Sequence, residues 1–133
     1  MTEGEKMKKE YRVKSDRDFQ RVFQEGASVA NRQFVIHFVR RKDCDHYRVG
    51  LSVSKRLGNA VMRNRIKRRM RHIMRHLDQC YQLAPMYDMV IIARQSVSHM
   101  TFEQMTSSLT HVLMLGELFL HPPIKKESTN SEI

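Results

Sequence analysis

The sequence predicts three helices packed on a small sheet, in a sandwich of the α+β or α/β class. Segments with helical periodicity alternate with short apolar runs, in the order helix, strand, strand, helix, strand, helix. With 133 residues and a hydrophobic content of 41%, the chain is expected to form one compact domain with a real core.

The first helix is predicted over residues 15–25. Ser15 followed by Asp18 resembles a capping box in which Asp replaces the usual Glu, and Gly26 ends the helical pattern. The apolar residues that recur at helical spacing in this segment are Phe19, Val22 and Phe23.

Two strands are predicted next, over residues 32–41 and 47–54, with a turn at residues 43–46 between them. The second strand alternates without interruption, which is typical of a strand with one buried face and one face of small polar groups. Its apolar face holds Tyr47, Val49, Leu51 and Val53, and its other face holds Arg48, Gly50, Ser52 and Ser54.

The helix that follows is strongly basic. Residues 46–77 contain no acidic residue, whereas ten Lys or Arg residues fall in that window. Leu57-Gly58-Asn59 predicts a turn, with Asn59 as the N-cap. At about 100° per residue, an apolar stripe separates from a polar one. The apolar stripe holds Met62, Ile66, Met70, Ile73, Met74 and Leu77, and the opposite face holds Asn64, Arg65, Lys67, Arg68, Arg71, His72 and Arg75.

The polar face of this helix places like charges side by side. Six pairs of Lys or Arg lie three or four residues apart, and together they cost about 1–3 kcal/mol before screening. Cations in the first turn also oppose the helix dipole. A charge run is usually a solvated face, but no acid neutralises this one, and the formal net charge of the chain is +10. A polyanionic partner therefore explains the pattern better.

The last two elements are a strand and a helix. Residues 89–93 follow Pro85 and predict a central strand. Thr101 and Gln104 form a capping box that begins a helix, which is expected to run to about Phe119.

The predicted single folded domain covers residues 12–120, between a flexible basic N-terminus at residues 1–11 and a disordered tail at residues 121–133. No apolar run approaches the roughly 18 residues of a spanning helix. The first residues lack the apolar stretch of a secretory signal, so we expect a cytoplasmic protein. Cys44 and Cys80 lack metal-binding spacing and are expected to be free thiols.

No motif predicts that the chain is a catalyst by itself. His72 and His76 have the spacing of two zinc ligands, but Ile73 stands where such metalloenzymes need Glu, and no third ligand is evident. Ser52 and Ser54 lack a nucleophile motif. We therefore expect neither catalytic residues nor metal ligands in this chain.

Phe19 and Phe23 allow two interpretations. Both could belong to the core, because a short helix needs only one apolar face. Alternatively, the first helix crosses the small-residue face of strand 47–54. A groove then remains in which an unpaired nucleic-acid strand could stack on an aromatic ring and pass basic side chains.

One stretch resembles a known family. Residues 50–68, GLSVSKRLGNAVMRNRIKR, are similar to the signature of the bacterial ribonuclease P protein component. That protein is the small basic subunit of the ribonucleoprotein that matures the 5′ ends of transfer RNA. Supporting matches are DFQRVF at residues 18–23, ANRQF at residues 30–34 and IIAR at residues 91–94. The resemblance covers about residues 11–118, and its central motif is specific because Gly, Asn and Arg positions all coincide.

The resemblance implies an α+β fold like domain 2 of ribosomal protein S5, with a small mixed sheet and three packed helices. It also implies a left-handed βαβ crossover through the basic helix, against the usual rule. The partners would be a catalytic RNA subunit and precursor tRNA, with no membrane and no required protein partner. Magnesium, bound mainly by the RNA, would supply the chemistry. The chain would be the accessory subunit of an endoribonuclease, with no intrinsic cofactor.

Site residues follow from the same resemblance. RNA-binding positions would be Arg63, Asn64, Arg65, Lys67, Arg68 and Arg71. The cleft for the 5′ leader would contain Phe19, Phe23 and Ser52, with His37 where the family commonly has an aromatic residue. Histidine can still stack or donate a hydrogen bond there.

Two other functions are weighed against this one. The chain could be a ribosome-associated or other structured-RNA-binding protein without an enzymatic assembly. DNA binding through a recognition helix is less consistent, because strands flank the basic helix on both sides.

Overall fold

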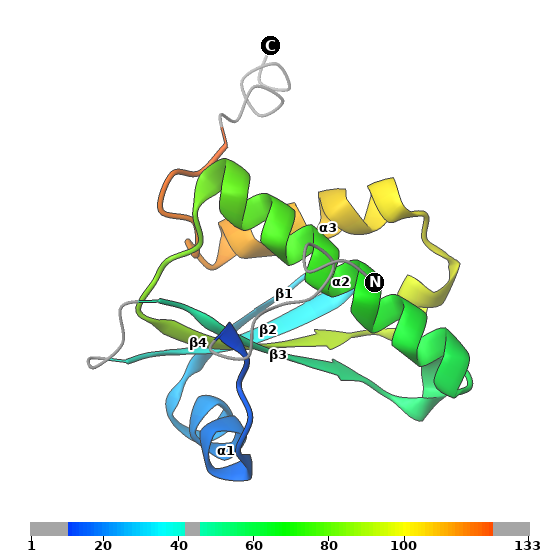
Figure 1. The fold of residues 1–133 in the computed structure, drawn as a ribbon, viewed down its shortest axis with the longest axis horizontal. Coiled ribbons are helices and arrows are strands. Elements are labelled where there is room, and N and C mark those ends of the chain that lie inside the picture. Colours follow the sequence, from blue (N-terminus) through cyan, green and yellow to red (C-terminus); the bar gives the residue numbers. More distant parts are fainter. Residues whose placement is uncertain (1–10, 42–45, 124–133) are drawn as a thin grey trace.

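The computed structural model describes residues 11–41 and 46–123 (Figure 1). It has the predicted α+β fold, a four-stranded mixed sheet with three α-helices. The elements in chain order are α1 (Asp16–Glu25), β1 (Ala27–Ala30), β2 (Phe34–Arg40), β3 (Arg48–Val53), the 3₁₀ helix η3 (Lys55–Leu57), α2 (Ala60–Tyr81), β4 (Tyr87–Ala93), the 3₁₀ helix η4 (Gln95–His99) and α3 (Phe102–Leu115). Residues 1–10, 42–45 and 124–133 lie outside the described residues, so the predicted tails and most of the turn at 43–46 stay predictions.

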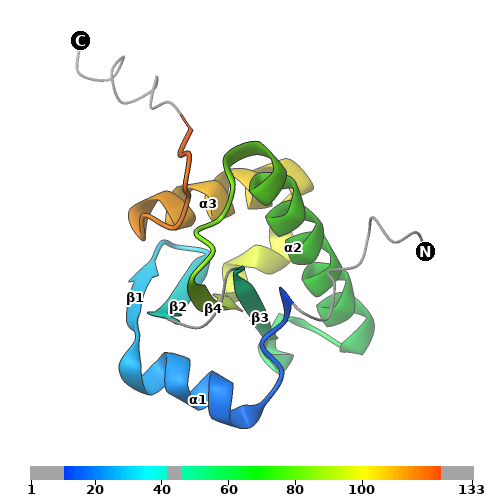
Figure 2. The ribbon, with the colours of Figure 1, turned by 60° about the vertical axis from the view of Figure 1, so that its left-hand side comes forward.

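The strand order in the sheet is β1-β2-β4-β3. Strands β1, β2 and β4 pair antiparallel, whereas β3 and β4 are parallel neighbours joined through α2. Seen from the side of α2 with both strands pointing up, β4 lies to the left of β3 (Figures 1 and 2). The crossover is therefore left-handed, as the resemblance implied, although most such connections are right-handed.

The sheet separates two helical layers. Helix α1 covers one face, and α2 and α3 cover the other (Figures 1 and 2). The main core lies between the sheet and the α2/α3 layer, where Ile36 of β2 pairs with Ile91 of β4 and both are fully buried. The apolar stripe predicted for α2 faces this core: Ile66, Met70, Ile73, Met74 and Leu77 are buried, and Met62 packs against them.

The predicted N-caps of the three helices are confirmed by hydrogen bonds from backbone N–H groups to the capping side chains. The Ser15 side chain accepts a hydrogen bond from the Asp18 N–H, and Asn59 accepts one from Met62. Thr101 and Gln104 form the reciprocal capping box of α3. Asp18 differs from the expected box, because its carboxylate pairs with Arg48 of β3 instead.

Two predictions about elements are wrong. Strand β1 was not expected, because its four residues are mostly small and exposed and it pairs along one side only, with β2. The last helix ends at Leu115 and not at Phe119. Glu117 has a φ of 55°, which breaks the helix and turns Leu118 and Phe119 into the core.

Candidate nucleic-acid interface

We call Arg63, Asn64, Arg65, Lys67, Arg68 and Arg71 the basic face of α2. At about 100° per residue, Asn64, Arg65 and Arg68 point away from the buried stripe of the helix, whereas Arg63 lies at its flank, about one turn before Ile66. Asn64, Arg65 and Arg68 are exposed, and the other three are half-buried. Arg63 donates through Nε to the Gly58 carbonyl oxygen at 3.3 Å, which holds its side chain against the turn before the helix. Gly58 has a φ of 138°, so this turn favours glycine. The turn therefore fixes where the basic face begins.

Arg12 extends this face from outside the helix. Residues 12 and 13 run along the outer edge of β3, where the Val13 N–H donates to the Val49 carbonyl oxygen at 3.2 Å. The pKa of the Arg71 guanidinium is lowered by burial and then by the charges of Arg12 and Arg68. Guanidinium groups from two chain segments are thus near enough to repel one another, an arrangement suited to phosphate oxygens.

A second surface lies on the face of the sheet that α1 covers. Three rows of side chains cross three strands there, in register. The rows are Arg48, Asp88 and Val39; Gly50, Val90 and His37; and Ser52, Ile92 and Val35. We call Phe19, Phe23, Val35, His37, Gly50, Ser52 and Ile92 the α1-side surface.

The two phenylalanines of α1 lie over the middle row. The ring centroid of Phe23 is 4.6 Å from that of His37, in an edge-to-face arrangement, and Phe23 is 45% exposed. Phe19 lies over Gly50, where a Cβ atom would be only 2.7 Å from its ring. The interpretation that both phenylalanines are core residues is therefore wrong for Phe23. Its exposed ring is available to a ligand.

The third row is the open part of the α1-side surface. Ser52 is exposed, and Val35 and Ile92 are half-buried. Beyond Ser52 the chain continues into η3, where Lys55 and Arg56 are exposed. The structure thus places all four predicted leader residues on one face and brings Phe23 and His37 into contact. Basic side chains follow at the end of β3.

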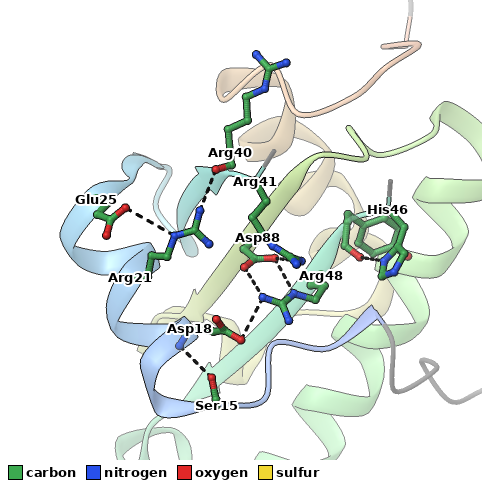
Figure 3. A network of polar contacts seen from close by, with 10 residues as sticks. Ser15, Asp18, Arg21, Glu25, Arg40, Arg41, His46, Arg48 and Asp88 are labelled. Atoms are coloured by element: carbon green, nitrogen blue, oxygen red, sulfur yellow. Dashed lines mark hydrogen bonds and ion pairs between the residues drawn. The ribbon is translucent and has the colours of Figure 1, made fainter. Parts of the chain in front are cut away.

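An ion-pair network fixes α1 to the first row (Figure 3). Asp88 of β4 is fully buried, and Arg48 donates to its two oxygens at 2.8 and 2.7 Å. Arg41 lies 3.3 Å from the same carboxylate, and Arg48 Nη2 also lies 3.1 Å from Asp18 Oδ2 on α1. The hydrogen bonds that Arg48 donates to Asp88 are the main reason that the pKa of Arg48 is raised.

Sequence reasoning missed this network, although a signal for it exists. Asp88 stands inside an apolar strand, and a buried carboxylate requires a cationic partner. Arg48 faces the same side of the sheet by strand alternation. No sequence pattern indicated that Arg12 lies beside the basic face, because its position depends on the pairing of residue 12 with β3.

Among the described residues, His, Cys, Asp and Glu side chains form no group of three or more that could hold a metal ion. Within the same residues, no helix is both long and apolar enough to cross a membrane.

Comparison with known proteins decides the family. The family described as Ribonuclease P matches residues 7–115. The chain belongs to the ribonuclease P protein family. The ribonuclease P protein component of Streptococcus mutans is 50% identical over 121 residues, which are 91% of this chain and 98% of that protein.

Solved ribonuclease P proteins share the fold. The Staphylococcus aureus protein has a TM-score of 0.75 at 46% identity, covering 82% of this chain and 97% of that one. The Thermotoga maritima protein has a TM-score of 0.69 at 31% identity, covering 77% and 94%. As a ribonuclease P protein component, the chain is a subunit of an RNA-containing enzyme that processes transfer RNA at the 5′ end.

Proposed function

We propose that the basic face of α2 binds the catalytic RNA of ribonuclease P, and that the α1-side surface binds the 5′ leader of precursor tRNA. Together these contacts promote 5′ maturation in the cytoplasm. The observation that carries the proposal is the acid-free basic face of an exposed helix, beside which Arg12 adds a further positive charge near Arg71. Phosphates would relieve the repulsion between these charges.

The α1-side surface supports a single-stranded ligand. Phe23 and His37 offer aromatic faces on which an unpaired base can stack, and stacking accepts any base. The open row of Val35, Ile92 and Ser52 continues the surface toward Lys55 and Arg56. A leader strand would therefore be held largely without reading its sequence.

The chemistry would belong to the RNA. Magnesium ions bound mainly by the RNA subunit would supply the activated water for hydrolysis. The role of the protein is to neutralise phosphates, draw the RNA into a compact form and hold the leader in place. It would contribute affinity and geometry to cleavage and no proton transfer.

Reconstitution tests the proposal. The chain is combined with a ribonuclease P RNA and a precursor tRNA at low magnesium concentration, and 5′ cleavage is measured with and without protein. We expect cleavage to depend on the protein. RNA binding without any change in the cleavage rate would favour a structured-RNA-binding protein outside an enzymatic assembly. Cleavage by the protein alone would contradict the assignment of chemistry to the RNA.

Arg68→Ala tests the basic face. It should weaken RNA binding and reduce the slope of log K against log salt by about one unit, because one phosphate contact is lost. Arg40→Ala, which removes an exposed charge at the end of β2, is the matched control and should leave that slope unchanged. If Arg68→Ala lowers the melting temperature and leaves the slope unchanged, Arg68 is structural.

Phe23→Ala tests the α1-side surface. Phe23 is the better choice than Phe19, because its exposed ring contributes less to packing. We expect about fivefold to 150-fold weaker binding of a precursor with a leader. Mature tRNA, which lacks the leader, serves as the control and should bind equally well to both proteins.

A further inference from the structure

We propose that Phe102, with His72 beside it, forms a stacking site for an unpaired base of the RNA that the basic face of α2 binds. This inference rests on the proposed function and adds a base-binding contact at the start of α3. The site lies in the α2/α3 layer, on the opposite side of the sheet from α1 (Figure 1).

The starting observation is a repeated side-chain pair. Among the described residues, two phenylalanines are exposed, Phe23 at 45% and Phe102 at 37%. Each lies against a histidine ring. The centroid separation is 4.6 Å for Phe23 and His37, and 5.5 Å for Phe102 and His72. The ring planes are inclined at 64° and 59°, so the two pairs have similar inclinations, although the second pair is more widely separated.

The exposure of Phe102 has no explanation in the packing of α3. Phe102 is the first residue of the helix, and the cap is made by Thr101 and Gln104. Phenylalanine has only moderate helix propensity, so this position gains little from it. Met105 and Leu109, further along the helix, provide buried side chains. The Phe102 ring instead contacts His72 of α2, and its exposed part can be reached by a ligand.

The Phe102 ring contacts α2 at a helical stripe that contains two arginines. His72 is exposed and belongs to a stripe at helical spacing on the flank of α2 nearest α3. Arg65, Arg69 and His76 complete that stripe. Arg69, one turn before His72, had no role in the basic face and would here contact the phosphate of the stacked nucleotide.

A base fits this position better than a phosphate does. Glu103 follows Phe102 and is exposed, which disfavours a phosphate at the start of α3. A neutral base plane meets no such repulsion, and single-stranded RNA is commonly recognised by stacking on aromatic side chains. The expected ligand is thus one unstacked base of the RNA subunit, with its backbone running along Arg65 and Arg69.

Binding to the RNA subunit tests the site with matched variants. Phe102→Leu keeps an apolar side chain and removes the aromatic face, whereas Phe102→Tyr keeps that face. We expect Phe102→Leu to weaken binding of the full chain about fivefold to 150-fold with an unchanged salt slope, and Phe102→Tyr to bind like the original. Equal affinity of Phe102→Leu and the original chain would overturn the inference.

A fluorescent reporter tests it independently of affinity. The sequence contains no Trp, so Phe102→Trp introduces a single tryptophan, whose emission can be excited separately from that of the four tyrosines. Its emission should be quenched when the RNA subunit is added, because a base stacks on the indole. Leu115→Trp, at the exposed far end of α3, is the control and should not be quenched. Unchanged emission of Phe102→Trp in the presence of bound RNA would also overturn the inference.

The two proposals fail in different ways. If the unsubstituted chain does not bind the RNA subunit, the proposed function is wrong and the stacking site with it. If that chain binds and the Phe102 variants give the negative results above, only the stacking site is wrong.

Discussion

Replacing Arg48 by Met tests whether the buried Asp88 depends on Arg48 as its ion-pair partner. The fully buried Asp88 would lose two hydrogen bonds of 2.8 and 2.7 Å and would keep Arg41 at 3.3 Å. Asp18 on α1 would lose its partner at 3.1 Å. Breaking a buried ion pair costs about 3–5 kcal/mol. Because Arg41 stays in place, we expect a loss near the lower end, about 3 kcal/mol.

The loss is measured as the free energy of unfolding in urea. A parallel thermal melt should show a melting temperature lowered by roughly 10 °C. Asp18→Asn is the matched control, because it removes only the contact to α1. The Asp18 side chain is 26% exposed, so its loss should cost less than about 1 kcal/mol. A loss below about 1 kcal/mol for Arg48→Met would refute the reasoning, since Asp88 would then be satisfied without Arg48.

Two further predictions concern Gly50 and Tyr47. Gly50→Ala places a methyl group 2.7 Å from the Phe19 ring, so the ring must move. We expect a loss of about 1–3 kcal/mol in urea unfolding, with precursor binding weakened more than mature tRNA binding, and equal weakening would argue against a leader contact. Burial, reinforced by Asp78, raises the pKa of Tyr47 above that of the unfolded chain. The contribution of Tyr47 to the free energy of unfolding is therefore complete below about pH 10. Above that pH it falls by up to about 1.4 kcal/mol per pH unit. In thermal melts between about pH 10 and 11, Tyr47→Phe should lose less stability than the original chain, and an equal loss would assign the effect to other groups.

Local signals explain why most helices and strands could be predicted. Ser15, Asn59 and Thr101 each cap a helix through a contact within three residues, which a sequence displays directly. The alternation of residues 47–54 likewise predicts the two faces of β3. Strand β1 carries no such pattern and forms only because β2 offers it an edge.

The candidate site was partly predictable for the same reason. Helical periodicity predicts that α2 has a polar, acid-free side, whereas the individual residues of the basic face and of the α1-side surface came from the resemblance to a family. Contacts between distant segments could not be read in this way. Arg12 lies near Arg71 because residues 12 and 13 run along β3, and Asp18 meets Arg48 across two elements. Such contacts depend on the assembled sheet, which no short window of sequence contains.

The position of the sheet between α1 and α2 has a consequence for assembly. Under the proposed function, the precursor leader binds on the α1 side of the sheet and the catalytic RNA binds on the α2 side. Neither RNA therefore blocks the binding surface of the other. Either RNA can then arrive first, and the two binding free energies should simply add. The two sides meet at the connection from β3 to α2, where Lys55 and Arg56 are exposed. That connection is the place where the leader on one side can come next to the catalytic RNA on the other.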